Sequence, residues 1–207
     1  MPRKEQKPER DFGIILRKLA IIITVISLIV GFFYLLFQPK YPHIVSHYKS
    51  QYAEMVKSKN ELLNYTRDVL KYSIAGLNYS ELLIWEHLYL TYISPSVDIG
   101  TREELPIPII EKGIGRCGEF ALLYNGLLLT NGYTCRIVID CSDKTDDRLA
   151  GDHVWNEVFL NGMWVHVDPT EQRINEPKMY VRDWEKNVNK VFAVTDNEII
   201  DVTSTYR

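Results

Sequence analysis

The segment 153–168 constrains the fold most, because it reads as two strands joined by a tight turn. Apolar and polar side chains alternate on both sides of Asn161-Gly162, a dipeptide typical of the type I′ turn in a two-residue hairpin. This turn sets the register, so that Asp168 lies opposite Trp155. His153 is then one diagonal step from Asp168 on the same face, where the two side chains can meet.

A cysteine thiol is the third reactive group, beside the imidazole of His153 and the carboxylate of Asp168. Cys117 follows Gly115-Arg116 and opens the segment 117–131, whose apolar side chains recur at helical three- and four-residue steps. The dipole and the free N–H groups of a helix N-terminus favour a thiolate and can hold an oxyanion. A nucleophilic thiol needs a base, and the base needs a group that orients it. We therefore expect Cys117 to be the nucleophile, His153 the general base and Asp168 the orienting group.

Two more hairpin residues have alternative interpretations. Trp155, next to His153, either shields the thiol and imidazole from water or is an ordinary aromatic residue of the sheet face. His166 lies opposite Glu157 in the predicted register and is a rival base, although a supporting or structural role fits it better.

A family resemblance rests on four segments, which are GRCGEFA (115–121), DHVWNEV (152–158), HVDPTE (166–171) and KVFAVTDNEIIDVTSTYR (190–207). They resemble the core of the peptide:N-glycanases, a branch of the transglutaminase-like superfamily. The resemblance covers about residues 80–207 and implies an α+β, papain-type fold, with a Cys-bearing helix packed on an antiparallel sheet. It implies the same catalytic triad, Cys117, His153 and Asp168, and it suggests that Trp85 supports the oxyanion. A plain core position is the alternative for Trp85.

The implied activity is a thiol-dependent amide hydrolysis through a thioester, with glycosylated Asn as the suggested substrate. A cysteine protease, transglutaminase-type acyl transfer from a protein glutamine to an amine, and a non-catalytic binding module are the alternatives. The eukaryotic glycanases carry paired Cys-x-x-Cys zinc ligands, whereas Cys117, Cys135 and Cys141 lack that spacing. We expect no metal and no cofactor, and Cys135 and Cys141 are interpreted as packed core thiols.

The N-terminal region predicts a membrane anchor. Residues 19–37 carry no charge and would span about 28 Å as a helix, close to the thickness of a hydrocarbon core. More basic residues precede this segment than follow it, so we expect residues 1–18 to be a cytoplasmic tail and the catalytic domain to be extracytoplasmic. The chain is thus predicted to be a single-pass membrane protein.

The segment 38–79 is predicted to be a helical stalk or linker before a catalytic domain over 80–207. Tyr48, Met55, Leu62 and Val69 recur every seven residues, a stripe that either packs on the chain's own domain or supports self-association. The partners that we expect are a protein, peptide or glycopeptide substrate and the membrane. The net charge of −3 and the lack of a basic stripe argue against nucleic acid. Asn64 and Asn78 lie in glycosylation sequons, whose use the sequence leaves open.

Overall fold

The computed structural model describes residues 12–36, 43–98, 100, 102–141, 153–180 and 190–207. The chain divides into two compact units, residues 1–40 and residues 41–207. The predicted domain boundaries at residues 18, 37 and 79 stay predictions. Most of the predicted basic tail, and Asp152 of the histidine motif, lie outside the described residues.

The first unit contains the helix α1 (Phe12–Leu36). In the part of the chain that the structure describes, no helix is long and apolar enough to cross a membrane, so the predicted transmembrane helix over 19–37 is not confirmed. Phe37 lies outside the described residues. The predicted orientation and location stay predictions.

The second unit is built on an antiparallel sheet with the strand order β6-β5-β4-β3-β7-β8. The strands are β3 (Cys135–Cys141), β4 (His153–Leu160), β5 (Met163–Asp168), β6 (Arg173–Ile174), β7 (Lys190–Val194) and β8 (Ile199–Asp201). Every residue of β3 is buried, as expected for a central strand with apolar neighbours on both sides. Cys135 and Cys141 are both buried, as predicted.

The predicted hairpin is confirmed. Strand β4 pairs with β5 in the register that brings Leu160 opposite Met163. The turn between them has φ values of 50° at Asn161 and 83° at Gly162, the left-handed conformations that a type I′ turn requires. Because side chains alternate along a strand, this register decides which residues of β4 and β5 can meet.

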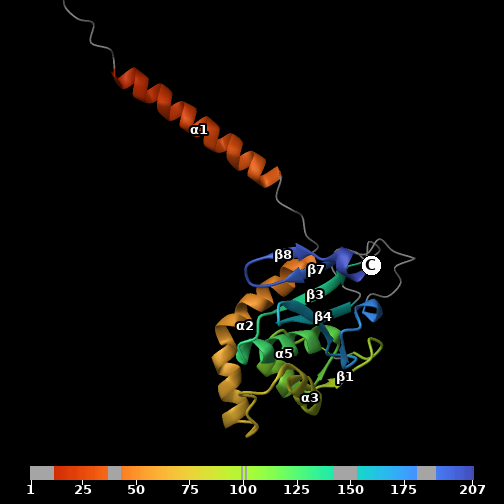
Figure 1. Ribbon diagram of the computed structural model, residues 1–207. Helices are drawn as coiled ribbons and strands as arrows, with labels where there is room; N and C mark the ends of the chain where they lie inside the picture. Colours follow the sequence, from red (N-terminus) through yellow and green to blue (C-terminus); the bar gives the residue numbers. More distant parts are fainter. Residues whose placement is uncertain (1–11, 37–42, 99, 101, 142–152, 181–189) are drawn as a thin grey trace, which may run out of the picture. The chain divides into compact units, whose positions relative to one another are not determined.

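Four helices of this unit contribute buried side chains to the larger of two apolar cores. They are α2 (His43–Asp68), α3 (Tyr79–Tyr89), α4 (Pro106–Lys112) and α5 (Cys117–Thr130). Figure 1 shows α2 and α5 side by side, with α5 against β3 and β4. The helix α5 is buried on all sides from Gly118 to Leu128, because the sheet covers one face and the helices cover the rest. The α+β fold with a Cys-bearing helix on an antiparallel sheet is thus confirmed.

The remaining elements are short. Strand β1 (Thr91–Tyr92) pairs in parallel with β2 (Ile114–Gly115), so the segment that precedes α5 is held against the end of α3. The 3-10 helix η1 (Pro177–Met179) follows β6, and the helix α6 (Thr203–Tyr206) follows β8. Tyr180 and Tyr206 belong to a second, smaller core around Val138 and Trp155.

The helix α2 is part of the second unit and not a free stalk. Of the predicted heptad stripe, Tyr48, Met55 and Leu62 are buried in the chain's own core. Val69 lies just past the end of α2 and is exposed, so the stripe is one position shorter than predicted. Of the two interpretations of this stripe, packing on the domain is therefore correct. These side chains already contact α5 and its neighbours. The stripe therefore does not offer an exposed surface for the predicted self-association.

Candidate active site

The structure brings Cys117, His153 and Asp168 together. His153 opens β4 and Asp168 ends β5, and the imidazole Nε2 lies 2.6 Å from the carboxylate Oδ2. The Cys117 thiol also interacts with this imidazole and raises its pKa. Since Nε2 is occupied by Asp168, Nδ1 is the nitrogen that remains for the thiol. The three residues thus form the thiol, imidazole and carboxylate relay predicted from the sequence, and their catalytic roles stay a prediction.

The environment of His153 favours the charged imidazolium. Burial of the ring lowers its pKa, but the hydrogen bond to Asp168, the interaction with Cys117 and the charges of both groups outweigh burial and raise the pKa to about 9. His153 therefore carries a proton near neutral pH. That proton is the one a leaving amine would need, so the arrangement suits acyl chemistry on an amide.

The start of α5 is fixed by close packing. Glu119 accepts a hydrogen bond from the backbone N–H of Arg116 at 3.0 Å, and its other oxygen lies 3.1 Å from the Arg102 guanidinium. The Arg116 side chain donates to the carbonyl oxygen of Val97 at 2.7 Å. These contacts hold the loop before α5 against the helix and leave Cys117 at its first turn, partly exposed.

A buried polar network lies behind the histidine. Trp155 stacks on His153 with ring centroids 5.7 Å apart, and its indole Nε1 donates to the Tyr206 hydroxyl at 2.9 Å. Tyr206 in turn donates to Glu157, and His166 Nδ1 lies 3.0 Å from the same carboxylate. Trp155 therefore packs on His153 from the second core, while His166 contacts Glu157 and Tyr206.

The helix α3 supports the turn that follows Asp168. His87 Nε2 donates to the carbonyl oxygen of Pro169 at 2.6 Å. Next to it, Glu86 is fully buried. Burial raises the pKa of Glu86 well above its ordinary value, and the charge of Asp168 raises it further, so this acid is neutral. Sequence reasoning missed Glu86, because an acid within an amphipathic helix is ordinarily taken to be solvent-exposed.

Trp85, on the same helix, lies in the apolar core. It is 1% exposed, and its indole Nε1 has no hydrogen-bond partner within the described ranges. Its ring packs on Tyr89 with centroids 4.3 Å apart. This environment is that of a core residue, and the suggested role of Trp85 at the oxyanion stays a prediction.

Tyr48 is an active-site neighbour that the sequence did not reveal. Its ring is buried, and its hydroxyl lies against Gly118, the residue after Cys117. The sequence showed only that Tyr48 belongs to an apolar stripe of a separate helix. The only signal in the sequence was a tyrosine at a core-facing position of the stripe, where its polar hydroxyl would need a polar environment.

Gly118 is required by this close approach, and Gly118→Ala is expected to destabilise the fold by about 1–3 kcal/mol. A Cβ at this position would lie 2.4 Å from the Tyr48 Oη but 3.7 Å from its Cζ. Removing the hydroxyl in the double variant Gly118→Ala, Tyr48→Phe should therefore restore most of the lost stability. Thermal unfolding of the four proteins of this cycle measures the coupling, and equal losses in the single and double variants would contradict the clash.

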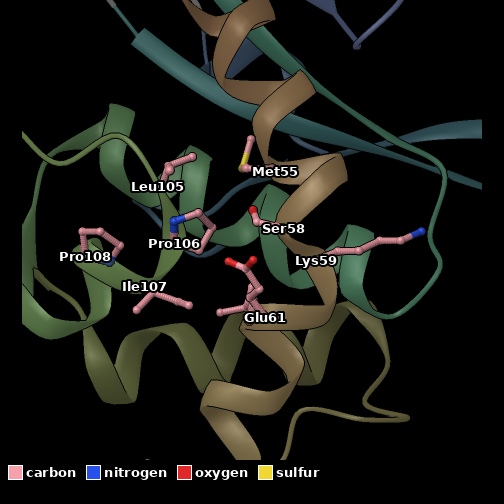
Figure 2. A pocket seen from close by; sticks show the side chains of 10 residues that line it. Met55, Ser58, Lys59, Glu61, Leu105, Pro106, Ile107 and Pro108 are labelled. Atoms are coloured by element: carbon pink, nitrogen blue, oxygen red, sulfur yellow. The ribbon is translucent and has the colours of Figure 1, made fainter.

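A separate pocket lies away from these residues. It has a volume of about 250 Å³ and lies between α2, the segment 105–108 and Gly126 of α5. Figure 2 shows Glu61 with its carboxylate pointing into this pocket, while Lys59 points away from the segment 105–108. None of the triad residues lines it. Across the described ranges, no group of three His, Cys, Asp or Glu side chains is arranged to hold a metal ion.

A family model described as the transglutaminase-like superfamily matches residues 51–169, more than half of the chain. The chain belongs to the transglutaminase-like superfamily. The match begins inside α2, so this helix is part of the family domain, and it ends just after Asp168. It contains all three residues of the relay described above, and the superfamily resemblance of the sequence motifs is confirmed.

The curated relatives are peptide-N(4)-(N-acetyl-beta-glucosaminyl)asparagine amidases. The Arabidopsis thaliana protein is 31% identical over 121 residues, which are 58% of this chain and 16% of the relative. The Caenorhabditis briggsae protein is 35% identical over 103 residues, 49% of this chain and 16% of the relative. The chain thus spans only a small part of the length of these relatives.

A solved structure from Cytophaga hutchinsonii, provisionally described as a cysteine protease, is also similar. It is 20% identical, and the match covers 79% of this chain and 57% of the other, with a TM-score of 0.40.

Proposed function

We propose that this chain is a thiol-dependent amide hydrolase, in which Cys117 is the nucleophile, His153 the acid and base, and Asp168 the group that orients the imidazole. The observation that supports this proposal most is the position of His153, which is hydrogen-bonded to Asp168 at 2.6 Å and whose pKa is raised by the neighbouring Cys117 thiol. A buried carboxylate that serves only a structural ion pair would not need a thiol as third partner.

In the proposed reaction the Cys117 sulfur, as thiolate, attacks the carbonyl carbon of an amide, and the carbonyl oxygen takes up the negative charge. The C–N bond then breaks, and the leaving nitrogen takes the proton from the His153 imidazolium. A thioester on Cys117 remains. His153, now neutral, accepts a proton from water as the water attacks this thioester. The C–S bond then breaks, and the carboxylic acid, the Cys117 thiolate and the His153 imidazolium result.

The substrate that we propose is the side-chain amide of a glycosylated Asn. The similarity to amidases that act on this linkage supports the choice, with 31% identity over 121 residues in the plant relative. In that case the thioester forms on the side-chain carbonyl of Asn, the glycan leaves as a glycosylamine, and hydrolysis converts Asn to Asp.

The test uses the chain and its Cys117→Ala variant with a glycopeptide that carries one N-linked glycan, read by mass spectrometry. We expect loss of the glycan together with conversion of Asn to Asp in the wild-type protein alone. A glycopeptide cut in its backbone would indicate a protease, and incorporation of an added amine at Gln would indicate acyl transfer. Equal results from both proteins in all three assays would contradict a thiol mechanism and favour a binding module.

A further inference from the structure

Tyr48 places a phenol hydroxyl beside the proposed nucleophile from a helix that is distant in the sequence. The side chain is 5% exposed, and its Oη lies so close to Gly118 that a Cβ there would be 2.4 Å away. Gly118 follows Cys117 in the first turn of α5. The electrostatic interaction between the Tyr48 phenol and the Cys117 thiol is strong enough to act on the titration of Tyr48, as expected for neighbouring groups.

The hydroxyl of Tyr48 is free to serve a ligand. Within the described residues it has no hydrogen-bond partner, whereas one helical turn along α2 the Tyr52 hydroxyl donates to the carbonyl oxygen of Cys135 at 2.7 Å. A hydroxyl beside a nucleophile that no protein group occupies is suited to a partner that exists only during the reaction.

The hydroxyl also stays protonated. Burial and the neighbouring Cys117 raise the pKa of Tyr48 far above its ordinary value, and the nearby Arg102 opposes this only in part. A neutral phenol is a hydrogen-bond donor at every pH at which the enzyme would work. The free backbone N–H groups at the start of α5 point to the same region, since a helix N-terminus leaves its first donors unpaired.

We propose that the Tyr48 hydroxyl donates a hydrogen bond to the oxyanion that forms when Cys117 attacks an acyl substrate. This inference rests on the proposed function. When the thiolate adds to the carbonyl carbon, the π electrons move to the oxygen, and Tyr48 stabilises this charge while keeping its own proton. On collapse the charge returns to the carbonyl bond and the leaving group departs, so Tyr48 is unchanged over the cycle.

The test compares the wild-type chain with Tyr48→Phe, Tyr52→Phe and Cys117→Ala. Acylation is measured as the burst of p-nitrophenolate from p-nitrophenyl acetate, which passes through an oxyanion and needs no proton for its leaving group. Alkylation of Cys117 by iodoacetamide is measured in parallel, because displacement at its methylene carbon forms no oxyanion. Tyr52→Phe is the matched control, since it also removes one buried hydroxyl from α2.

We expect Tyr48→Phe to lower the burst rate by about 10²-fold and to leave the alkylation rate within about twofold of wild type. Tyr52→Phe should change neither rate by more than about twofold. Normal burst kinetics in Tyr48→Phe would overturn the inference. An equal fall of acylation and alkylation would also overturn it, because it would show that Tyr48 only positions the thiol.

Failure of the proposed function gives a different result. In that case Cys117→Ala shows the same release of p-nitrophenolate as wild type, so the ester is not cleaved through the thiol and the role of Tyr48 falls with it. A burst that depends on Cys117 but not on the Tyr48 hydroxyl leaves the function standing and refutes the inference alone.

Discussion

Asp168→Asn is expected to lower the rate of acyl transfer by about 10⁴-fold without unfolding the protein. The Asp168 Oδ1 accepts the backbone N–H of Thr170 at 3.0 Å, and this contact would hold the amide oxygen of an Asn in the same place. The amide nitrogen would then face His153 Nε2, now 2.6 Å from Oδ2. Because two donors cannot pair, the imidazole must carry its proton on Nδ1 and can no longer accept one from the thiol.

The same substitution should change the dependence on pH. The pKa of His153 is about 9, raised against the effect of burial by Asp168 and Cys117, so the wild-type rate should fall above about pH 9 as the imidazolium loses the proton that the leaving group needs. Without the carboxylate the pKa falls, and this alkaline limb should move to lower pH in Asp168→Asn.

Profiles of rate against pH for both proteins measure this shift. Asp68→Asn, which changes an exposed carboxylate paired with Arg67, is the control and should behave as wild type. A variant at position 168 that keeps its rate within about tenfold, with an unmoved limb, would show that Asp168 does not orient the base.

Glu157→Gln is expected to destabilise the fold by about 3–5 kcal/mol. Glu157 is fully buried and forms an ion pair with Arg136, which is 7% exposed. The variant keeps the size of the side chain but leaves the Arg136 charge without a partner in the interior. His166 Nδ1, 3.0 Å from the carboxylate, and the Tyr206 hydroxyl would also lose their charged acceptor.

The contribution of Glu157 to the stability of the fold should also depend on pH. Burial alone would raise its pKa, but His166, Arg136 and Tyr206 together lower it below the ordinary value. A carboxylate with a lowered pKa stabilises the native state at neutral pH, and this stabilisation is lost as the pH falls through the lowered pKa. The difference in stability between wild type and Glu157→Gln should therefore shrink on acidification.

Thermal unfolding followed by tryptophan fluorescence at several pH values measures both effects. Glu54→Gln, which removes an exposed pair with Lys57, is the matched control and should change the stability by less than about 0.5 kcal/mol. An effect of Glu157→Gln as small as that of the control would show that the buried network is not held by charge.

Residues close in the sequence determined the pairing of His153 with Asp168. The turn at Asn161-Gly162 sets the register of β4 and β5 within a few residues, so the meeting of His153 and Asp168 could be predicted without knowing the rest of the fold. The position of Cys117 at a helix start likewise follows from the periodicity of the residues after it. Turn chemistry and helical period are local properties, and local properties are readable in a sequence.

The surroundings of the relay depended on the tertiary structure. The seven-residue stripe of α2 showed that one face of the helix is apolar, but the same pattern suits a self-associating stalk and a core helix. Only packing against α5 decided between them, and it brought the Tyr48 hydroxyl to Gly118 from 70 residues away in the chain. The neutral, buried Glu86 was hidden for the same reason, since burial depends on which elements cover a helix and a sequence does not record what covers it.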